Sequence, residues 1–195
     1  MYPFLTVFRR TAFAMLKPRL PAGSKTRASY VCMPWDLDHW GEMNHGRVLT
    51  LSDVVLPMSA ARVGLMQLVL RRGWALTMAG ATTRWRHRIR PFMRVTFVQR
   101  LLGWDARFVY LEVTIWHKDR AMAQTLYRSA VRGPEGAIAP AELVEALGGA
   151  DAIFAGVEEE ALTPNGPSPD GTPPAWVRAW ADADALRPWP PEAMP

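Results

Sequence analysis

The sequence contains a single cysteine, Cys32, among its 195 residues. One thiol excludes an intrachain disulfide framework and every zinc site built from several cysteines. No run of 18 apolar residues occurs, so no segment is predicted to cross a membrane. The first 21 residues are interrupted by Arg9 and Arg10 and lack a small-residue cleavage site, which argues against a signal peptide. We expect a cytoplasmic protein.

The composition, with 49% apolar and 21% charged residues, indicates one globular domain with an appendage. The charge is divided along the chain. Residues 1–132 hold 21 Lys and Arg against 7 Asp and Glu, whereas residues 133–195 hold 2 against 11. Either the basic part attracts an anionic partner such as nucleic acid, lipid headgroups or a phosphorylated cofactor, or the acidic tail neutralises it. The dispersed arginines and the lack of a recognised motif argue against nucleic acid.

Residues 1–27 are predicted to form an N-terminal helix and a linker. Apolar residues recur at helical spacing over residues 4–16, around Arg9 and Arg10. The favoured interpretation is a short amphipathic helix docked on the body of the protein. The alternative is an interfacial helix that makes peripheral contact with a membrane through residues 1–16.

Residues 28–148 are predicted to form the main domain. A strand over 28–35 leads through a polar turn into a buried helix over 48–70, which Pro57 is expected to kink or divide, with Gly64 as a second weak point. Four strand-like runs follow, over residues 76–90, 93–102, 107–117 and 121–132. The order predicts an α+β fold in which a curved antiparallel sheet wraps one long buried helix. Self-association is expected to cover the edge of such a sheet.

Side-chain alternation predicts which residues of the strand-like run over 76–90 face the core. Period two over residues 84–90 would place four arginines on one sheet face and Trp85, His87 and Ile89 on the core face. Residues 149–195 form an acidic, proline-rich extension with a possible docking helix over 175–187.

The turn before the buried helix concentrates the candidate chemistry. The first backbone N–H groups of a helix lack internal partners, so they can hold an anion or a developing oxyanion. Asp36 and Asp38 lie just upstream of Asn44, His45 and Gly46, and a carboxylate there can attack a carbonyl or activate a water molecule. The competing interpretation is that Asp38 and Asn44 only cap the helix.

Two runs in this region carry a resemblance to a known family. Residues 36–38 (Asp-Leu-Asp) and 42–47 (Glu-Met-Asn-His-Gly-Arg) resemble the Asp-Leu-Asp … His-Met-Asn-Asn-x-Arg-Tyr signature of hotdog-fold acyl-CoA thioesterases. Residues 86–92 and 100–112 are similar to the thioesterase-superfamily-member-six-like branch of the 4-hydroxybenzoyl-CoA thioesterase group. The resemblance covers residues 28–132, and its two halves occur in the expected order.

The resemblance implies an acyl-CoA substrate, no separate cofactor, and a homodimer or dimer of dimers. It assigns Asp38 as nucleophile or general base, Asn44 to the catalytic signature, and the N–H groups of His45 and Gly46 to the thioester carbonyl. Glu42 stands where the family has His, His45 where it has a second Asn, and Val48 where it has Tyr.

The neighbouring groups complete the candidate site. Glu42 is a candidate catalytic partner of Asp38, and Asp36 and His39 are candidates for substrate contact. No metal site is expected, because no known ligand spacing is matched. The leading hypothesis is therefore a thioester hydrolase. The alternative is a catalytically silent hotdog protein that binds acyl-CoA or lipid.

Overall fold

A computed structural model describes residues 4–155, 157 and 165–188. Its strands are β1 (Thr26–Val31), β2 (Ala75–Trp85), β3 (Arg94–Trp104), β4 (Val109–His117), β5 (Arg120–Gly133) and β6 (Gly136–Ile138). Its helices are α1 (Phe4–Met15), α2 (His45–Arg62), α3 (Leu65–Arg72), α4 (Pro140–Ala146), α5 (Gly149–Phe154) and α6 (Ala175–Ala185). A single 3₁₀ turn, η1 (Pro34–Asp36), follows β1.

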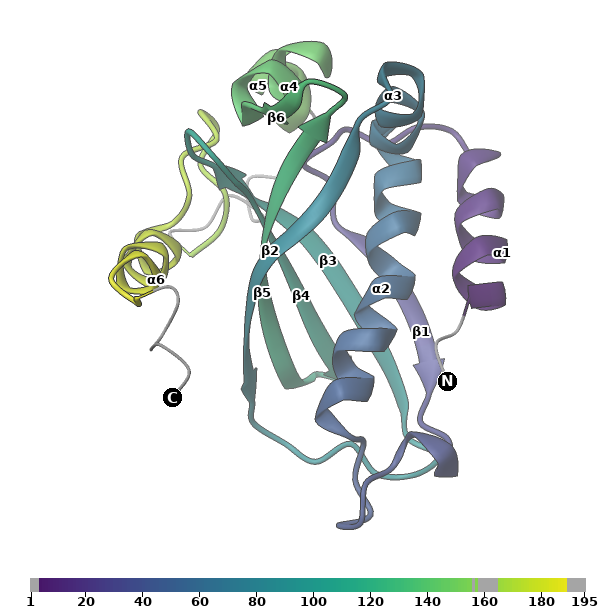
Figure 1. Cartoon of the computed structure of the whole chain (residues 1–195). Coiled ribbons are helices and arrows are strands. Elements are labelled where there is room, and N and C mark those ends of the chain that lie inside the picture. The colour runs from purple at the N-terminus through teal and green to yellow at the C-terminus, as the bar shows by residue number, and fades with distance from the viewer. Residues whose placement is uncertain (1–3, 156, 158–164, 189–195) are drawn as a thin grey trace.

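The strands form one antiparallel sheet in the order β1-β3-β4-β5-β2, with β6 paired to β5. The sheet curls around α2 (Figure 1), and the main core lies between them. Val48 and Val55 of α2 are buried against Phe97, Val113 and Ile115 of the sheet. The predicted α+β architecture, a curved sheet around a long buried helix, is confirmed.

The long helix is divided at Gly64 and not at Pro57. Pro57 lies inside α2, which runs on to Arg62. Gly64 adopts a φ of +81°, a left-handed conformation that a helix cannot continue through, and α3 leaves at 82° to α2. Pro57 therefore does not divide the helix, and Gly64, the second weak point predicted from the sequence, is the break.

Two strands end earlier than predicted. β1 ends at Val31, because Pro34 opens the η1 turn. β2 ends at Trp85, where the N–H groups of residues 86 and 87 both donate to the carbonyl of Met122. The face alternation predicted over residues 84–90 therefore stops at Trp85. His87 is exposed, so the prediction that it faces the core was wrong, whereas Ile89 is buried in the main core as predicted.

The two terminal helices lie on opposite sides of the molecule. α1 lies along α2, on the side away from β2 (Figure 1). α6 packs on the outer face of the sheet, where Val177 is buried against Leu102, Tyr110 and Leu126. Arg128 forms an ion pair of 2.7 Å with Asp184, so part of the acidic tail does meet the basic body.

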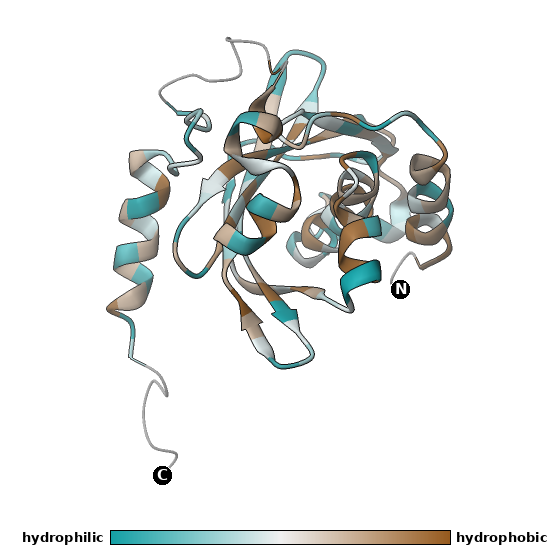
Figure 2. Cartoon of the chain, turned by 90° about the horizontal axis from the view of Figure 1, so that it is seen from above, coloured by the Kyte–Doolittle hydropathy of each residue, from teal (hydrophilic) through white to brown (hydrophobic). Residues whose placement is uncertain are grey.

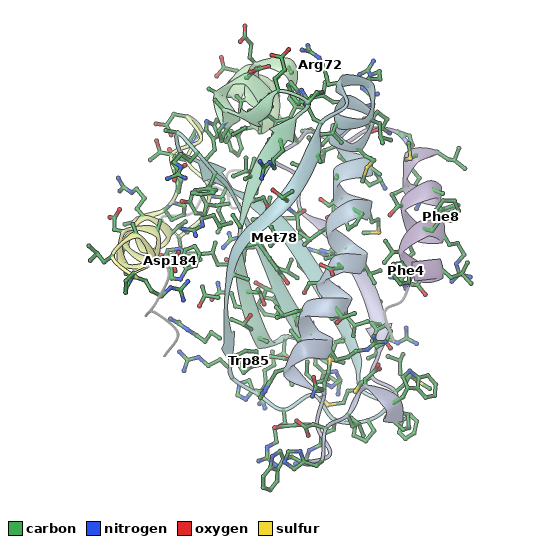
Figure 3. The ribbon with its side chains drawn as sticks, in the orientation of Figure 1. Phe4, Phe8, Arg72, Met78, Trp85 and Asp184 are labelled. Carbon is green, nitrogen blue, oxygen red and sulfur yellow. The ribbon has the colours of Figure 1, made fainter. Side chains whose placement is uncertain are left out.

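β2 forms one edge of the sheet and is exposed along most of its length. Leu76, Met78 and Trp85 are large apolar side chains left partly in solvent there, and Figure 3 shows Met78 and Trp85 on this strand. Among the described helices, none alone has the length and apolar character of a membrane span. Only α2 and α3 taken together pass that test, and they are a sharply bent pair.

Candidate functional site

The predicted site residues lie on one compact loop that runs from the last residue of η1 into the first turn of α2. Its two arms are tied together by backbone hydrogen bonds. Asn44 N–H donates to the Asp36 carbonyl, and Asp38 N–H donates to the Glu42 carbonyl, both at 2.8 Å. Gly41, with a φ of +72°, closes the tip by donating to the Asp38 carbonyl. The loop therefore holds all the predicted residues in a fixed backbone frame at the start of α2.

Asp36 is the buried anchor of this frame. Its carboxylate accepts the Tyr30 hydroxyl at 2.7 Å, the Met33 N–H at 2.8 Å and Arg47 Nε at 2.6 Å. The Asp36 side chain has no exposed surface. Burial, and then the hydrogen bond to Asp36, raises the pKa of Tyr30. Because three donors already occupy the carboxylate, Asp36 positions the loop, and its predicted contact with substrate stays untested.

Asp38 is half-buried and more available. Its Oδ1 accepts the N–H of Trp40 at 2.8 Å, which closes a local turn. Its Oδ2 has no hydrogen-bond partner within the described part of the chain. Asp38 does not cap α2, so the capping interpretation does not apply to it. The ring of His39, the next residue, packs against that of Trp40 at a centroid distance of 4.7 Å.

Glu42 is paired with a cation. Its carboxylate lies 3.2 Å from Arg88 Nε, and Arg88 is mostly exposed. The sequence offered no signal for this pair, because Arg88 follows the end of β2 in a segment that was predicted to be strand. Glu42 thus has a solvent-screened partner beside the loop.

Asn44 is the N-cap of α2. Its Oδ1 accepts the N–H of Gly46 at 2.9 Å and that of Arg47 at 3.3 Å. The N–H of His45 has no acceptor among the residues that the structure describes. Of the two N–H groups predicted to hold a carbonyl oxygen, that of Gly46 is engaged and that of His45 is available.

The His45 imidazole packs on the end of β2. Its ring centroid lies 4.5 Å from that of Trp85, whose position is shown in Figure 3. Trp85 was expected to be a core residue, but it is 45% exposed. This contact connects the start of α2 with the exposed sheet edge. It was missed because the sequence does not show where β2 ends.

The described residues contain no group of three or more His, Cys, Asp or Glu side chains able to hold a metal ion. His39 and His45 each pack on a different tryptophan. Cys32 is fully buried next to the loop, and burial, followed by the charge of Asp36, raises the pKa of its thiol to about 11. A thiol held protonated in this way is a poor nucleophile.

An apolar cavity of about 530 Å³ lies further along α2, between that helix, α3 and strands β2 and β3. Its walls include Leu56, Ala60, Met66, Trp74 and Leu101. None of the loop residues from Asp36 to Gly46 contributes to its lining. At 1.5 Å per helical residue, Asp53, the nearest α2 residue in the wall, is about 12 Å along the helix from His45.

Comparison with known proteins agrees with this fold. The family model of the thioesterase-like superfamily matches residues 32–136, and the chain belongs to that superfamily. Protein THEM6 of Xenopus laevis is 34% identical over 110 residues, which cover 54% of this chain and 53% of that protein. The match thus spans about half the length of this relative.

Solved structures share the hotdog architecture at low identity. The 1,4-dihydroxy-2-naphthoyl-CoA thioesterase of Synechocystis has a TM-score of 0.56 at 13% identity, covering 69% of this chain and 99% of that one. YbaW of Escherichia coli, a probable thioesterase, has a TM-score of 0.54 at 17% identity, covering 62% and 95%. The hotdog fold predicted from the sequence resemblance is confirmed.

Proposed function

We propose that this protein hydrolyses an acyl-CoA thioester. The observation that carries the proposal is that one loop presents a carboxylate oxygen without a partner, Asp38 Oδ2, and the open N–H of His45 at the start of α2. The N–H and the helix dipole stabilise the oxyanion that forms as the thioester carbonyl is attacked. Membership of the thioesterase-like superfamily supports the same reaction.

In this reaction Asp38 has two routes. As a general base it takes a proton from water, whose oxygen bonds to the acyl carbon while the carbon–sulfur bond breaks. As a nucleophile it bonds to the acyl carbon itself while the carbon–sulfur bond breaks and CoA leaves as the thiolate, which takes up a proton. Water then hydrolyses the resulting anhydride and restores the Asp38 carboxylate. In both routes the products are a carboxylic acid and free CoA thiol. Glu42, with Arg88 beside it, is the proposed partner that adjusts the charge near Asp38.

The apolar cavity supports an acyl group with a long hydrophobic portion. An acyl chain whose carbonyl is held by the His45 N–H needs to extend about 12 Å along α2 before it enters the cavity. Burial of the chain between α2 and the sheet would then supply binding energy in proportion to its apolar area. A short acyl group does not reach this space.

The exposed edge of β2 supports a homodimer. Unpaired backbone groups and apolar side chains on an edge strand favour pairing with a second copy. Trp85, which contacts His45, lies on this edge, so pairing would bring a partner subunit next to the start of α2. Assembly beyond the dimer stays a prediction, as does the cytoplasmic location.

A second function is favoured by one specific observation. Asn44 occupies the N–H of Gly46, which leaves a single open donor at the start of α2. A one-donor site stabilises an oxyanion less than a two-donor site does. The corresponding candidate is a protein that binds acyl-CoA and does not turn it over.

Thiol release from short, long and aromatic acyl-CoAs tests the proposal, with wild type compared with Asp38→Asn. We expect turnover on a long-chain substrate and a loss of at least 100-fold in Asp38→Asn, with unchanged thermal unfolding. Full activity in that variant would remove Asp38 from the reaction. Tight binding by calorimetry with no turnover on any substrate would instead establish the silent binder.

The cavity is tested separately with Ala60→Leu, which narrows it. We expect kcat/KM to fall about tenfold or more for long acyl-CoAs and to stay unchanged for short ones. The matched control is Ala179→Leu on the exposed surface of α6. Equal losses on short and long substrates would argue against an acyl site in the cavity.

A further inference from the structure

Helix α1 binds the body of the protein through its more polar side. Ala14 is buried, Thr11 is half-buried, and Arg10 donates to the Ser29 carbonyl of β1 at 3.0 Å. α1 lies along α2 in both views of the molecule (Figures 1 and 2). The prediction that this helix docks on the body of the protein is therefore confirmed by its contact with α2. Docking does not explain why most of its large apolar side chains are exposed.

The apolar side of α1 faces solvent. The exposed fractions are 74% for Phe8 and 79% for Leu5, and Figure 3 shows Phe8 on the side away from α2. At 100° per residue these side chains occupy one half of the helix surface. The other large apolar side chains exposed on or directly after this helix are Phe4, Phe13, Met15 and Leu16. An apolar surface of this kind in a folded protein marks an interaction site.

Basic residues border this surface. Lys17 lies over the ring of Phe13 at 4.8 Å from its centroid. A groove of about 480 Å³ runs between α1, β1 and the end of α2. The cationic side chains that line it are Arg10, Lys17, Lys25, Arg27 and Arg62.

Among the residues that the structure describes, no Asp or Glu lines this groove to balance its charge. The first Asp or Glu in the sequence is Asp36, so residues 1–35 carry six basic residues and no acid. The acidic tail segment that is described packs on the opposite side of the sheet, where Asp184 pairs with Arg128. The region around α1 is therefore strongly positive next to an exposed apolar helix face.

We propose that α1 inserts its outward face into the headgroup layer of an anionic phospholipid membrane, with the neighbouring groove binding headgroup phosphates. A helix with a wide apolar face and basic residues at its border lies in the membrane interface. Anionic lipid attracts each nearby Lys or Arg, and this attraction weakens with salt. The chemistry of both surfaces thus favours anionic lipid over a protein or a second copy of the chain. This proposal does not depend on the hydrolysis of a thioester.

The test is flotation of the full chain with vesicles of phosphatidylglycerol and phosphatidylcholine, compared with phosphatidylcholine alone. We expect binding at least tenfold stronger to the anionic vesicles, and weaker binding as the salt concentration rises. Leu5→Gln/Phe8→Gln is expected to lower binding at least tenfold. The control Leu186→Gln removes a leucine that is 85% exposed near α6, and it is expected to bind as wild type does.

The charge is tested with Lys25→Glu/Arg27→Glu against Arg120→Glu/Arg178→Glu, which makes the same change in net charge at exposed sites elsewhere. Only the first pair is expected to lose binding, by at least tenfold. Equal loss in both pairs, or equal binding to neutral and anionic vesicles, would overturn the proposal. A fall in oligomer mass in Leu5→Gln/Phe8→Gln, without vesicle binding by wild type, would instead assign the face to a second copy.

Discussion

Two ion pairs at the candidate site differ in burial, so they are expected to contribute differently to stability. Asp36 is completely enclosed, and Arg47 is its cation. Glu42 and Arg88 meet in a partly open position, with Arg88 66% exposed. Removing one partner of a buried pair leaves a desolvated charge, whereas water screens the partner left behind at the surface.

We therefore predict that Arg47→Met lowers the free energy of unfolding by about 3–5 kcal/mol. Arg88→Met is the matched control, and its cost is expected to be about 1 kcal/mol or less. Urea unfolding of both variants measures the difference. Similar small losses in both would mean that the Tyr30 and Met33 donors alone are enough to hold Asp36.

The Cys32 thiol provides a second prediction at this scale. Its pKa of about 11 leaves about one thiolate in a thousand at pH 8, against about one in ten for an exposed thiol of pKa 9. Labelling by an aromatic disulfide at pH 8 is therefore expected to be at least 100-fold slower in the folded protein than in urea.

The same raised pKa affects stability at alkaline pH. The unfolded thiol ionises first as the pH rises, so stability present below pH 9 is lost between pH 9 and 11. Burial also raises the pKa of Tyr127 to about 12, which acts in the same direction at higher pH. Cys32→Ala is expected to lose less stability than wild type over pH 9–11. An identical pH profile would show that other groups dominate.

At the level of elements, hydrophobic alternation predicted the existence of the four long strands, and apolar continuity predicted the buried helix. The strand ends were not predictable. Residues 86–90 continue an alternating pattern beyond Trp85, yet two of their N–H groups share the Met122 carbonyl and the ladder stops. The sequence motif also identified the candidate residues of the loop before α2. It did not show that Asp36 is enclosed by Tyr30 and Arg47, because those contacts depend on tertiary packing.

The segment that leads into α6 depends on one glycine. Gly171 has a φ of +81°, and its carbonyl accepts the N–H of Trp104 at 2.9 Å. A Cβ atom at this position would collide with the Trp104 indole. Gly171→Ala is therefore expected to cost about 2–4 kcal/mol, from backbone strain and overpacking together.

The control for this prediction is Gly149→Ala, which also has a positive φ, of 87°, but has open space around it. Its expected cost is about 1–2 kcal/mol from backbone strain alone. Thermal unfolding compares the two variants. Equal costs would mean that the indole moves aside readily.

For the whole molecule, the main prediction concerns the exposed edge of the sheet. Ala81 is exposed near the middle of β2 and does not line the apolar cavity. In a dimer formed through this edge, Ala81→Lys would bring two like charges close together. We expect light scattering to show the mass of a dimer for wild type and a shift toward monomer for Ala81→Lys.

Ala179→Lys on α6 adds the same charge to an exposed surface far from this edge, and it is expected to leave the mass unchanged. If the proposed thioesterase depends on a partner subunit, the specific activity of Ala81→Lys should fall with the dimer fraction on dilution. A wild-type protein that is monomeric at micromolar concentration would contradict the edge-pairing model.

The sharp bend at Gly64 has a consequence for how this fold can diversify. α3 turns across the end of the apolar cavity, where Leu65, Met66 and Val69 form part of its wall. The residue at which the helix breaks therefore sets how deep that space is, while the loop with Asp38 remains at the other end of α2. Moving the break by one or two residues would change the size of the cavity and leave the loop with Asp38 unchanged. The size of the cavity and the proposed chemistry of the loop therefore depend on opposite ends of one helical stretch.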